Sequence, residues 1–322
     1  MNIGLDMMGG DLAPLEACKG VTRYFQENHH DLLSGKLVRH LYLFGQSETA
    51  EANKHIPKEY EPYYTWVECP EVIGYHEHPT KALKEKQRSS ISIGFHFLAT
   101  GKIDAFISAG NTGAMLVGAM YSIKPISGLL RPTIATVLPK IDGSTGLLLD
   151  VGLNADCKPE HLVQFATLAN IYAEQILGIQ APGVALLNIG EEEGKGNILA
   201  QAAYPLFKEN NSFKFIGNVE GRDLFGSKAD VYVCDGFTGN IVLKMAESIY
   251  EVAQARGLAH DEYFKRFHYE NYGGTPVLGV HKPVIIGHGI SESPAFSNMI
   301  QLAAKMIESG FCEKIQAAFS AE

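Results

Sequence analysis

Long apolar segments are missing from this chain of 322 residues, although 46% of its residues are hydrophobic. No apolar run approaches the roughly 18 residues that a membrane-spanning helix needs. The first residues, MNIGLDMMGGD, carry neither a basic stretch nor an apolar stretch of signal-peptide length, so we expect no secretory signal. The composition predicts a water-soluble globular protein, long enough for one large domain or two closely joined ones.

Cysteine is scarce, because the chain has five and no two of them form a CxxC pair. Their odd number and wide scatter disfavour a disulfide framework or a zinc site and indicate a reducing cytosol. His76 and His78 flank Glu77 without the HExxH spacing of a metal-binding helix, so we expect no metal site. Cys157 lies close to His161, and we interpret this pair as packing at a helix start rather than as a catalytic dyad.

Positive charge is also in deficit, because 27 Lys and Arg residues stand against 36 Asp and Glu residues, a net charge of −9. Phosphate backbones bind basic surfaces, so this balance argues against nucleic acid as a partner. An acidic protein partner would have to meet a local basic patch.

Several nucleotide and nucleophile motifs are absent from the sequence. It contains no GxxxxGK[ST] of a P-loop, no GxGxxG with a following acidic residue and no GxSxG around a serine nucleophile. We therefore expect no organic cofactor and no covalent enzyme intermediate. The sequence favours a direct transfer in which a bound anion is itself the attacking group.

What the chain does contain is an alternation of apolar strand candidates with helical patterns. This alternation is typical of an α/β fold with a largely parallel sheet, and we treat residues 1–322 as a single domain with a helical projection at about 245–272. The predicted strands are 2–6, 39–46, 65–69, 103–108, 134–138, 146–151, 183–189, 213–217, 229–234 and 283–287. The predicted helices are 14–27, 79–102, 113–124, 159–178, 196–209, 239–257 and 293–309.

Two segments interrupt this alternation. Residues 124–146 contain Pro and Gly, and they suit either an antiparallel insertion or a subdomain hinge. Residues 255–274 mix aromatic and basic side chains. They form either a solvated helical connection or a projection that faces a partner or a membrane.

Glycine-bearing loops follow most of the predicted strands, and in parallel α/β sheets ligands collect at the carboxyl ends of the strands. Two loops share one pattern, SAGNTGAM at 108–115 and CDGFTGNIV at 234–242, each placed after an apolar run and before a helix. Thr112 and Thr238 can act as helix N-caps or donate their hydroxyls to a bound oxyanion. We expect the two turns to converge into one pocket for a small multivalent anion.

Lys195 stands between Gly194 and Gly196 in the loop EEEGKGN. Its ammonium suits phosphate as a point charge. The alternative is a solvated loop lysine.

With these loops in view, the chain resembles the acyl-ACP:phosphate acyltransferase (PlsX-type) family over essentially its whole length. The resemblance rests on segments that occur in the same order: LDMMGGD, SAGNTGA, RPTIATVLP, LLDVGLNADCKPEHLVQFA, ALLNIGEEEGKG, DVYVCDGFTGNIVLK, YGGTPVLGV and HGISES. It implies a three-layer α/β/α fold, similar to phosphotransacetylases and isocitrate-dehydrogenase-like folds.

The resemblance also implies a reaction, in which orthophosphate and a long-chain acyl group on acyl carrier protein give acyl phosphate. It implies a homodimer in the cytoplasm, with peripheral contact at the inner membrane face. There a glycerol-3-phosphate acyltransferase would consume the product.

Roles for individual residues follow from the loops together with this reaction. We expect Asn111, Asn154 and Asn240 to orient phosphate or the thioester oxygen, Lys195 to supply charge and Asp235 to handle a proton. The expected phosphate-binding residues are Gly110, Thr112, Gly113, Gly236, Thr238 and Gly239. The expected loop-supporting residues are Asp6, Gly9, Gly10, Asp11 and Asp150.

Acyl carrier protein is acidic, so this enzyme would need basic side chains to bind it. Lys81, Lys84 and Arg88 would share one face of the predicted helix, and Lys265 with Arg266 forms a second cluster. The alternative is an ordinary solvated helix surface.

The chain departs from the family pattern at two places. It has Gly152-Leu153-Asn154 where the family usually has Gly-Ala-Asn, and its helical region between Asn240 and Gly273 is short, which puts membrane contact there in doubt. Three other functions stay open: a CoA-dependent phosphotransacylase, a dehydrogenase on a similar fold, and a non-catalytic carrier-protein scaffold at the membrane.

Overall fold

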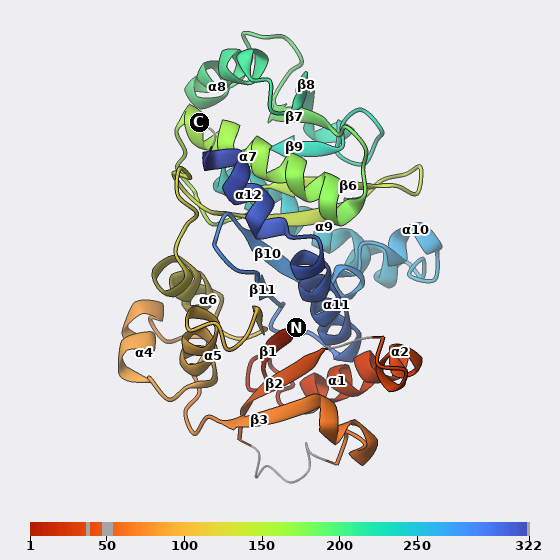
Figure 1. The fold of residues 1–322 in the computed structure, drawn as a ribbon. Coiled ribbons are helices and arrows are strands. Elements are labelled where there is room, and N and C mark those ends of the chain that lie inside the picture. The colour runs from red at the N-terminus through yellow and green to blue at the C-terminus, as the bar shows by residue number, and fades with distance from the viewer. Residues whose placement is uncertain (37–38, 47–53, 321–322) are drawn as a thin grey trace. The chain divides into compact units, whose positions relative to one another are not determined.

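The computed structural model describes residues 1–36, 39–46 and 54–320. The chain divides into two compact units, each an α/β arrangement of a central sheet with helices packed on it (Figure 1). The first unit comprises Met1–Pro125 and Tyr269–Cys312, and the second comprises Ile126–His268 and Glu313–Glu322. The predicted α/β class is confirmed, whereas the single domain over 1–322 stays a prediction.

The sheet of the first unit has the strand order β3-β2-β1-β4-β11-β10. Neighbouring strands run parallel, apart from the antiparallel pair β10 and β11. The strands are β1 (Asn2–Asp6), β2 (His40–Gly45), β3 (Tyr64–Glu68), β4 (Ala105–Ser108), β10 (Thr275–Leu278) and β11 (Val284–Ile286). Strand β4 is buried at every position, as expected of a central parallel strand covered on both faces.

Helices cover this sheet on both faces. Helix α5 contacts β1, β2 and β4, whereas α1 and α11 pack against each other and α11 contacts β1, β4 and β11 (Figure 1). Helix α6 continues directly as the π-helical turn η2. The helical elements are α1 (Leu15–Glu27), α2 (His29–Leu33), η1 (Lys58–Tyr63), α4 (Pro79–Glu85), α5 (Ser90–Ala99), α6 (Thr112–Gly118), η2 (Ala119–Ile123), η5 (Tyr269–Tyr272) and α11 (Ser293–Glu308).

The sheet of the second unit has the order β5-β6-β9-β7-β8, with β5 antiparallel to β6 and the other pairs parallel. The strands are β5 (Thr133–Pro139), β6 (Thr145–Leu149), β7 (Gly183–Asn188), β8 (Lys214–Glu220) and β9 (Val231–Val233). The helical elements of this part of the chain are α7 (Pro159–Tyr172), η3 (Ala173–Leu177), α8 (Ile198–Glu209), η4 (Gly221–Asp223), α9 (Gly236–Ala255) and α10 (Glu262–Lys265), followed at the C-terminus by α12 (Phe311–Ser320).

The predicted helix over 79–102 is wrong, because the chain forms two helices, α4 and α5, with a break between them. Ser89 is the reason for the break. Its hydroxyl accepts the N–H of Ser92 at 3.2 Å, and it caps the start of α5 with extended backbone angles. The apolar periodicity of the two helices reads as one pattern in the sequence because only four residues separate them.

The region 124–146 forms the antiparallel pair β5 and β6, which confirms the antiparallel alternative. The boundary between the two units, after Pro125, also lies in this region. Strand β10 is missing from the sequence-based prediction, because Pro276 lies inside it and proline is unfavourable in a strand interior.

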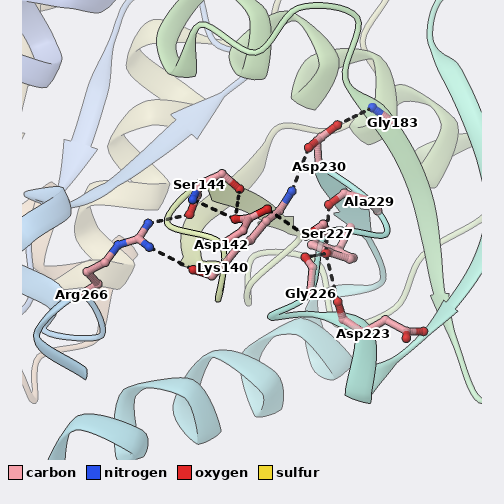
Figure 2. Close-up of polar contacts among 11 residues, drawn as sticks. Lys140, Asp142, Ser144, Gly183, Asp223, Gly226, Ser227, Ala229, Asp230 and Arg266 are labelled. Atoms are coloured by element: carbon pink, nitrogen blue, oxygen red, sulfur yellow. Dashed lines mark hydrogen bonds and ion pairs between the residues drawn. The ribbon is translucent and has the colours of Figure 1, made fainter. Parts of the chain in front are cut away.

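An ion pair between the buried Lys140 and the partly exposed Asp230 links the β5–β6 turn to the rest of the second unit (Figure 2). Lys140, at the end of β5, is 2% exposed, and its Nζ lies 2.8 Å from Oδ1 of Asp230. The other carboxylate oxygen of Asp230 accepts the N–H of Gly183 at 2.9 Å. One carboxylate therefore links the starts of β7 and β9 to the turn before β6.

This pair predicts a large loss of stability when one partner is removed. Asp230→Asn should lower the free energy of unfolding by about 1–3 kcal/mol, because it removes the carboxylate that pairs with the buried Lys140 ammonium. Adding Lys140→Met should recover most of the loss, because the unpaired charge is then gone. Urea unfolding of the two variants measures both effects.

The exposed pair Lys208–Glu193 provides the control. Neutralising it as Lys208→Met with Glu193→Gln should change the free energy of unfolding by less than about 1 kcal/mol. Equal losses at the buried and the exposed pair would contradict the fastening role of Lys140 and Asp230.

Candidate active site

Three loops meet at the carboxyl edge of the first unit's sheet. Strands β1, β4 and β11 run parallel, so the loops 6–11, 108–113 and 287–291 begin at the same edge. The N–H of Asp11 donates to the carbonyl oxygen of Gly289 at 2.7 Å. A Cβ atom on Gly9 would lie 2.5 Å from the backbone nitrogen of Gly110, so the first two loops lie too close to each other for a side chain at this position.

The carboxylate of Asp6 supports the loops at this edge of the sheet. It is fully buried, and its carboxylate accepts the hydroxyl of Ser108 at 2.6 Å and the N–H of Met8 at 2.9 Å. The Ser108 oxygen in turn accepts the N–H of Gly110 at 2.9 Å. Burial raises the pKa of the Asp6 carboxyl, while the hydrogen bonds from Ser108 and Ser90 act in the opposite direction. These contacts are those of a residue that supports loops.

Asn111 is the N-cap of α6, and both polar atoms of its side chain form hydrogen bonds within the protein. Its Oδ1 accepts the N–H of Ala114 at 2.9 Å. Its Nδ2 donates to the carbonyl oxygens of Gly74, Tyr75 and Glu77 at 2.9, 3.2 and 3.2 Å. The arrangement favours a positioning role for Asn111, and direct contact with phosphate stays a prediction.

Thr112 is exposed at the first position of α6. The alternative that it acts as the N-cap is wrong, because Asn111 occupies that place. Across residues 1–36, 39–46 and 54–320, the Thr112 hydroxyl and the backbone N–H groups of Thr112 and Gly113 have no partner, as is usual in the first turn of a helix. These three donors are therefore without a partner in the described part of the chain, and Thr112 itself is exposed.

The 71–78 segment lies against this turn, and the sequence-based prediction missed it. Glu77 accepts the N–H of Gly74 and the Nζ of Lys86, both at 2.6 Å, and Lys86 also donates to the carbonyl of Val72 at 2.8 Å. The hydrogen bond from Lys86 lowers the pKa of Glu77. No local motif marks this segment, since its contacts depend on the tertiary fold.

In the second unit, the loop after β6 wraps around the buried carboxylate of Asp150. Its Oδ2 accepts the backbone N–H and the Nδ2 of Asn154, both at 2.7 Å. Its Oδ1 accepts the N–H groups of Gly152 and Leu153 at 3.2 and 3.1 Å. The Nδ2 of Asn154 donates further to the carbonyl of Pro132 at 2.8 Å. Asp150 and Asn154 therefore hold the loop, and a catalytic role of Asn154 stays a prediction.

Several N–H groups at the start of α9 already have hydrogen-bond partners within the chain. Asp235 is the N-cap, and its carboxylate accepts both the N–H and the hydroxyl of Thr238 at 2.9 Å. The N–H of Gly236 donates to the carbonyl of Asn154 at 2.7 Å, and that of Gly239 to the carbonyl of Asp235 at 3.0 Å. The N-cap alternative for Thr238 is wrong, and three backbone donors expected to bind phosphate already bind within the chain.

Close packing explains the glycines of this turn. A Cβ atom on Gly239 would lie 1.8 Å from the carbonyl oxygen of Asp150, and one on Gly236 would lie 2.7 Å from that of Asn154. Glycine at both positions lets α9 approach the 150–154 loop. Asn240 is exposed one residue further on.

Lys195 is exposed in the loop between β7 and α8, where its N–H donates to the carbonyl of Glu192 at 3.0 Å. Its role toward phosphate stays a prediction, as do the roles of Asn240 and Asp235. The expected convergence of the turns 108–114 and 234–240 joins residues of different units, and it also stays a prediction.

The first predicted carrier-protein cluster, Lys81, Lys84 and Arg88, does not lie on a single helix. Lys81 belongs to α4, where it lies 4.0 Å from Glu85, whereas Arg88 lies in the break before α5. One shared helix face for Lys81, Lys84 and Arg88 is therefore wrong. Lys84 and Arg88 are exposed, and their charged groups have no partner among the residues that the structure describes.

The second cluster is engaged within the second unit. Lys265 pairs with Glu262 at 2.6 Å. The guanidinium of Arg266 donates to the carbonyl oxygens of Lys140 and Ser144 at 3.0 and 2.6 Å, so it fastens the α10 region to the β5–β6 turn (Figure 2). Carrier-protein binding by this cluster stays a prediction.

Cys157 and His161 lie at the start of α7. The Nδ1 of His161 accepts the N–H of Lys158 at 3.1 Å, and the Cys157 thiol donates to the carbonyl of Asn154 at 3.5 Å. Burial raises the pKa of Cys157 to about 11, so the thiol is neutral at physiological pH. These contacts support packing at the helix start.

Two further properties of the described residues bear on function. Among them, no three His, Cys, Asp or Glu side chains gather as a metal site would require. None of the helices in that part of the chain combines the length and the apolar character needed to cross a bilayer.

Comparison with known proteins places this chain among acyltransferases. The family model described as "Fatty acid synthesis protein" matches residues 1–263 and 257–314. The phosphate acyltransferase of Dictyoglomus thermophilum is 42% identical over 336 residues, covering 98% of this chain and 96% of that relative. The phosphate acyltransferase of Desulfitobacterium hafniense (strain Y51) matches with the same identity and coverage.

Solved structures share the fold at low sequence identity. A phosphotransacetylase from Streptococcus pyogenes superposes with a TM-score of 0.62 at 18% identity, covering 96% of this chain and 94% of that one. A branched-chain phosphotransacylase from Enterococcus faecalis gives a TM-score of 0.61 at 16% identity, with 95% and 99% covered. This likeness confirms the predicted three-layer α/β/α fold.

The packing of α9 predicts that Gly239 tolerates no side chain. Gly239→Ala should lower the free energy of unfolding by about 1–3 kcal/mol or more, because the added methyl meets a backbone oxygen that cannot swing away. The matched control is Gly221→Ala in the same unit, where a Cβ atom would have no neighbour within 4 Å. Chemical denaturation compares them, and equal stability of the two variants would refute the close approach.

Proposed function

The chain belongs to the phosphate acyltransferase family, and we propose that it transfers a long-chain acyl group from acyl carrier protein to orthophosphate. The products are an acyl phosphate and free carrier protein. Membership of the family makes the chain an acyltransferase rather than a dehydrogenase or a non-catalytic scaffold. The description of the matching family model supports a substrate from fatty acid synthesis.

The proposed step needs no protein nucleophile. A phosphate oxygen attacks the thioester carbonyl, the new C–O bond forms, the C–S bond breaks, and the thiolate leaves with the electron pair and then takes up a proton. Phosphate is already ionised near pH 7, and a thiol with a pKa of about 8.5 is a good leaving group. Burial raises the pKa of Cys157 and Cys234, which supports direct attack by phosphate over an acyl-cysteine.

The main support for the location of the phosphate site is the difference in charge between the N-caps of two helices. In the first unit, the neutral amide of Asn111 caps α6 and leaves the donors of Thr112 and Gly113 open. In the second unit, the carboxylate of Asp235 already supplies an anion to α9. Because a helix start favours one negative charge, we place phosphate at the Thr112 turn.

The remaining partners follow from the same proposal. Lys84 and Arg88 offer unpaired positive charge to the acidic carrier protein. The enzyme works as a homodimer in the cytoplasm, in peripheral contact with the inner face of the membrane. A glycerol-3-phosphate acyltransferase consumes the acyl phosphate, which leads to phosphatidic acid.

Thr112 gives the sharpest test of the phosphate site. Thr112→Val keeps the shape of the side chain but removes the hydroxyl, so the KM for phosphate should rise about tenfold while the KM for palmitoyl carrier protein stays unchanged. Thr112→Ser should restore most of the affinity. The assay follows the formation of acyl phosphate from palmitoyl carrier protein at varied phosphate concentration.

Thr100→Val is the matched control, because the Thr100 hydroxyl binds the carbonyl of His96 at the end of α5. An unchanged phosphate KM in Thr112→Val would exclude the Thr112 turn as the site. The wild-type enzyme is assayed with palmitoyl-CoA in parallel. Equal or faster turnover of palmitoyl-CoA would replace the carrier-protein reaction with the CoA-dependent alternative.

A further inference from the structure

The hydroxyl of Tyr75 touches all three loops at the carboxyl edge of the first unit. It donates to the carbonyl oxygen of Ala109 at 2.9 Å, and the nearby N–H of Gly10 acts to lower its pKa. A Cβ atom on Gly289 would lie 3.1 Å from the same oxygen. The phenol oxygen is therefore hydrogen-bonded to the loop after β4 and lies next to the loops after β1 and β11.

The backbone of Tyr75 is held as firmly as its hydroxyl. Its carbonyl oxygen and those of Gly74 and Glu77 accept the side-chain amide of Asn111. Glu77 and its bond to Lys86 brace the segment from the other side. The phenol is thus fixed at both ends against the turn that begins α6.

The hydrogen bonds of Tyr75, Ser108 and Asp6 form a continuous network through one peptide group. The carbonyl of Ala109 accepts from Tyr75, and the N–H of the same peptide, on Gly110, donates to Ser108, which donates to the buried Asp6. Because a peptide group is planar, holding its oxygen and its N–H fixes its orientation. In the sequence, this peptide is followed directly by Asn111 and by the donors of Thr112 and Gly113 that have no partner among the described residues.

Tyr75 contributes little to the hydrophobic core, because 44% of it is exposed. Partial burial and the nearby Asp11 raise the pKa of Tyr75, so its hydroxyl keeps its proton and remains a donor at physiological pH. A half-exposed tyrosine whose hydroxyl is hydrogen-bonded at the edge of a candidate site suits a role in binding rather than in folding.

We propose that Tyr75 is a positioning residue for phosphate, whose hydroxyl orients the Ala109–Gly110 peptide and thereby the donors at Thr112 and Gly113. This inference rests on the proposed function, because it assumes that phosphate binds at the Thr112 turn. Tyr75 does not touch the reacting atoms. It sets the geometry in which the anion is received.

Tyr75→Phe tests the proposal, because it removes the hydroxyl and keeps the ring. The KM for phosphate should rise about tenfold, as expected for the loss of one hydrogen bond that orients a binding turn. The KM for palmitoyl carrier protein should stay within twofold and the Tm within about 2 °C. The matched control is Tyr121→Phe, at an exposed tyrosine of η2 in the same unit, which should change none of these values.

Calorimetric titration with inorganic phosphate separates this inference from the proposed function. If the wild type binds phosphate and Tyr75→Phe binds it about tenfold more weakly, the positioning role holds whatever acyl donor is used. If both bind phosphate equally, Tyr75 is not a positioning residue. The same conclusion follows if the variant has a lower Tm together with a higher KM for both phosphate and palmitoyl carrier protein. If the wild type binds no phosphate, the proposed site and this inference both fail.

Discussion

The burial of one carboxylate, that of Asp6, is the constraint on which the carboxyl edge of the first unit depends. A buried carboxylate is costly unless hydrogen bonds satisfy it, and Ser108 and the N–H of Met8 do so. These partners belong to the loops after β1 and β4, so satisfying Asp6 brings both loops together. The close approach of Gly9 to Gly110 completes the arrangement.

The second unit also satisfies a buried carboxylate at the end of a strand, with different residues. Asp150 is buried after β6 and accepts four hydrogen bonds from the 152–154 backbone and the Asn154 amide. The helix caps differ in charge, since Asn111 is neutral and Asp235 is anionic. The two turns look alike in sequence, yet the Asp235 cap already places a carboxylate at the second helix start, which is why we propose the first turn for the anion.

Local patterns predicted much of the fold, and tertiary contacts account for what they missed. The apolar runs of β1, β4 and β6 and the helical periodicity of α7 and α11 are visible in the sequence. The break at Ser89 and the strand around Pro276 are not, because capping and pairing override the local pattern there. The contacts of Tyr75 with three loops could not be predicted, since they join residues far apart in the chain.

Hydrogen–deuterium exchange with and without inorganic phosphate tests the central claim, that the Thr112 turn of the first unit receives the anion. Peptides covering 108–118 and 71–78 should exchange more slowly when phosphate is added, because bound phosphate occupies the open N–H donors and steadies the turn. Peptides covering β8 should not change. No slowing at 108–118, or slowing confined to residues 236–246, would contradict the assignment.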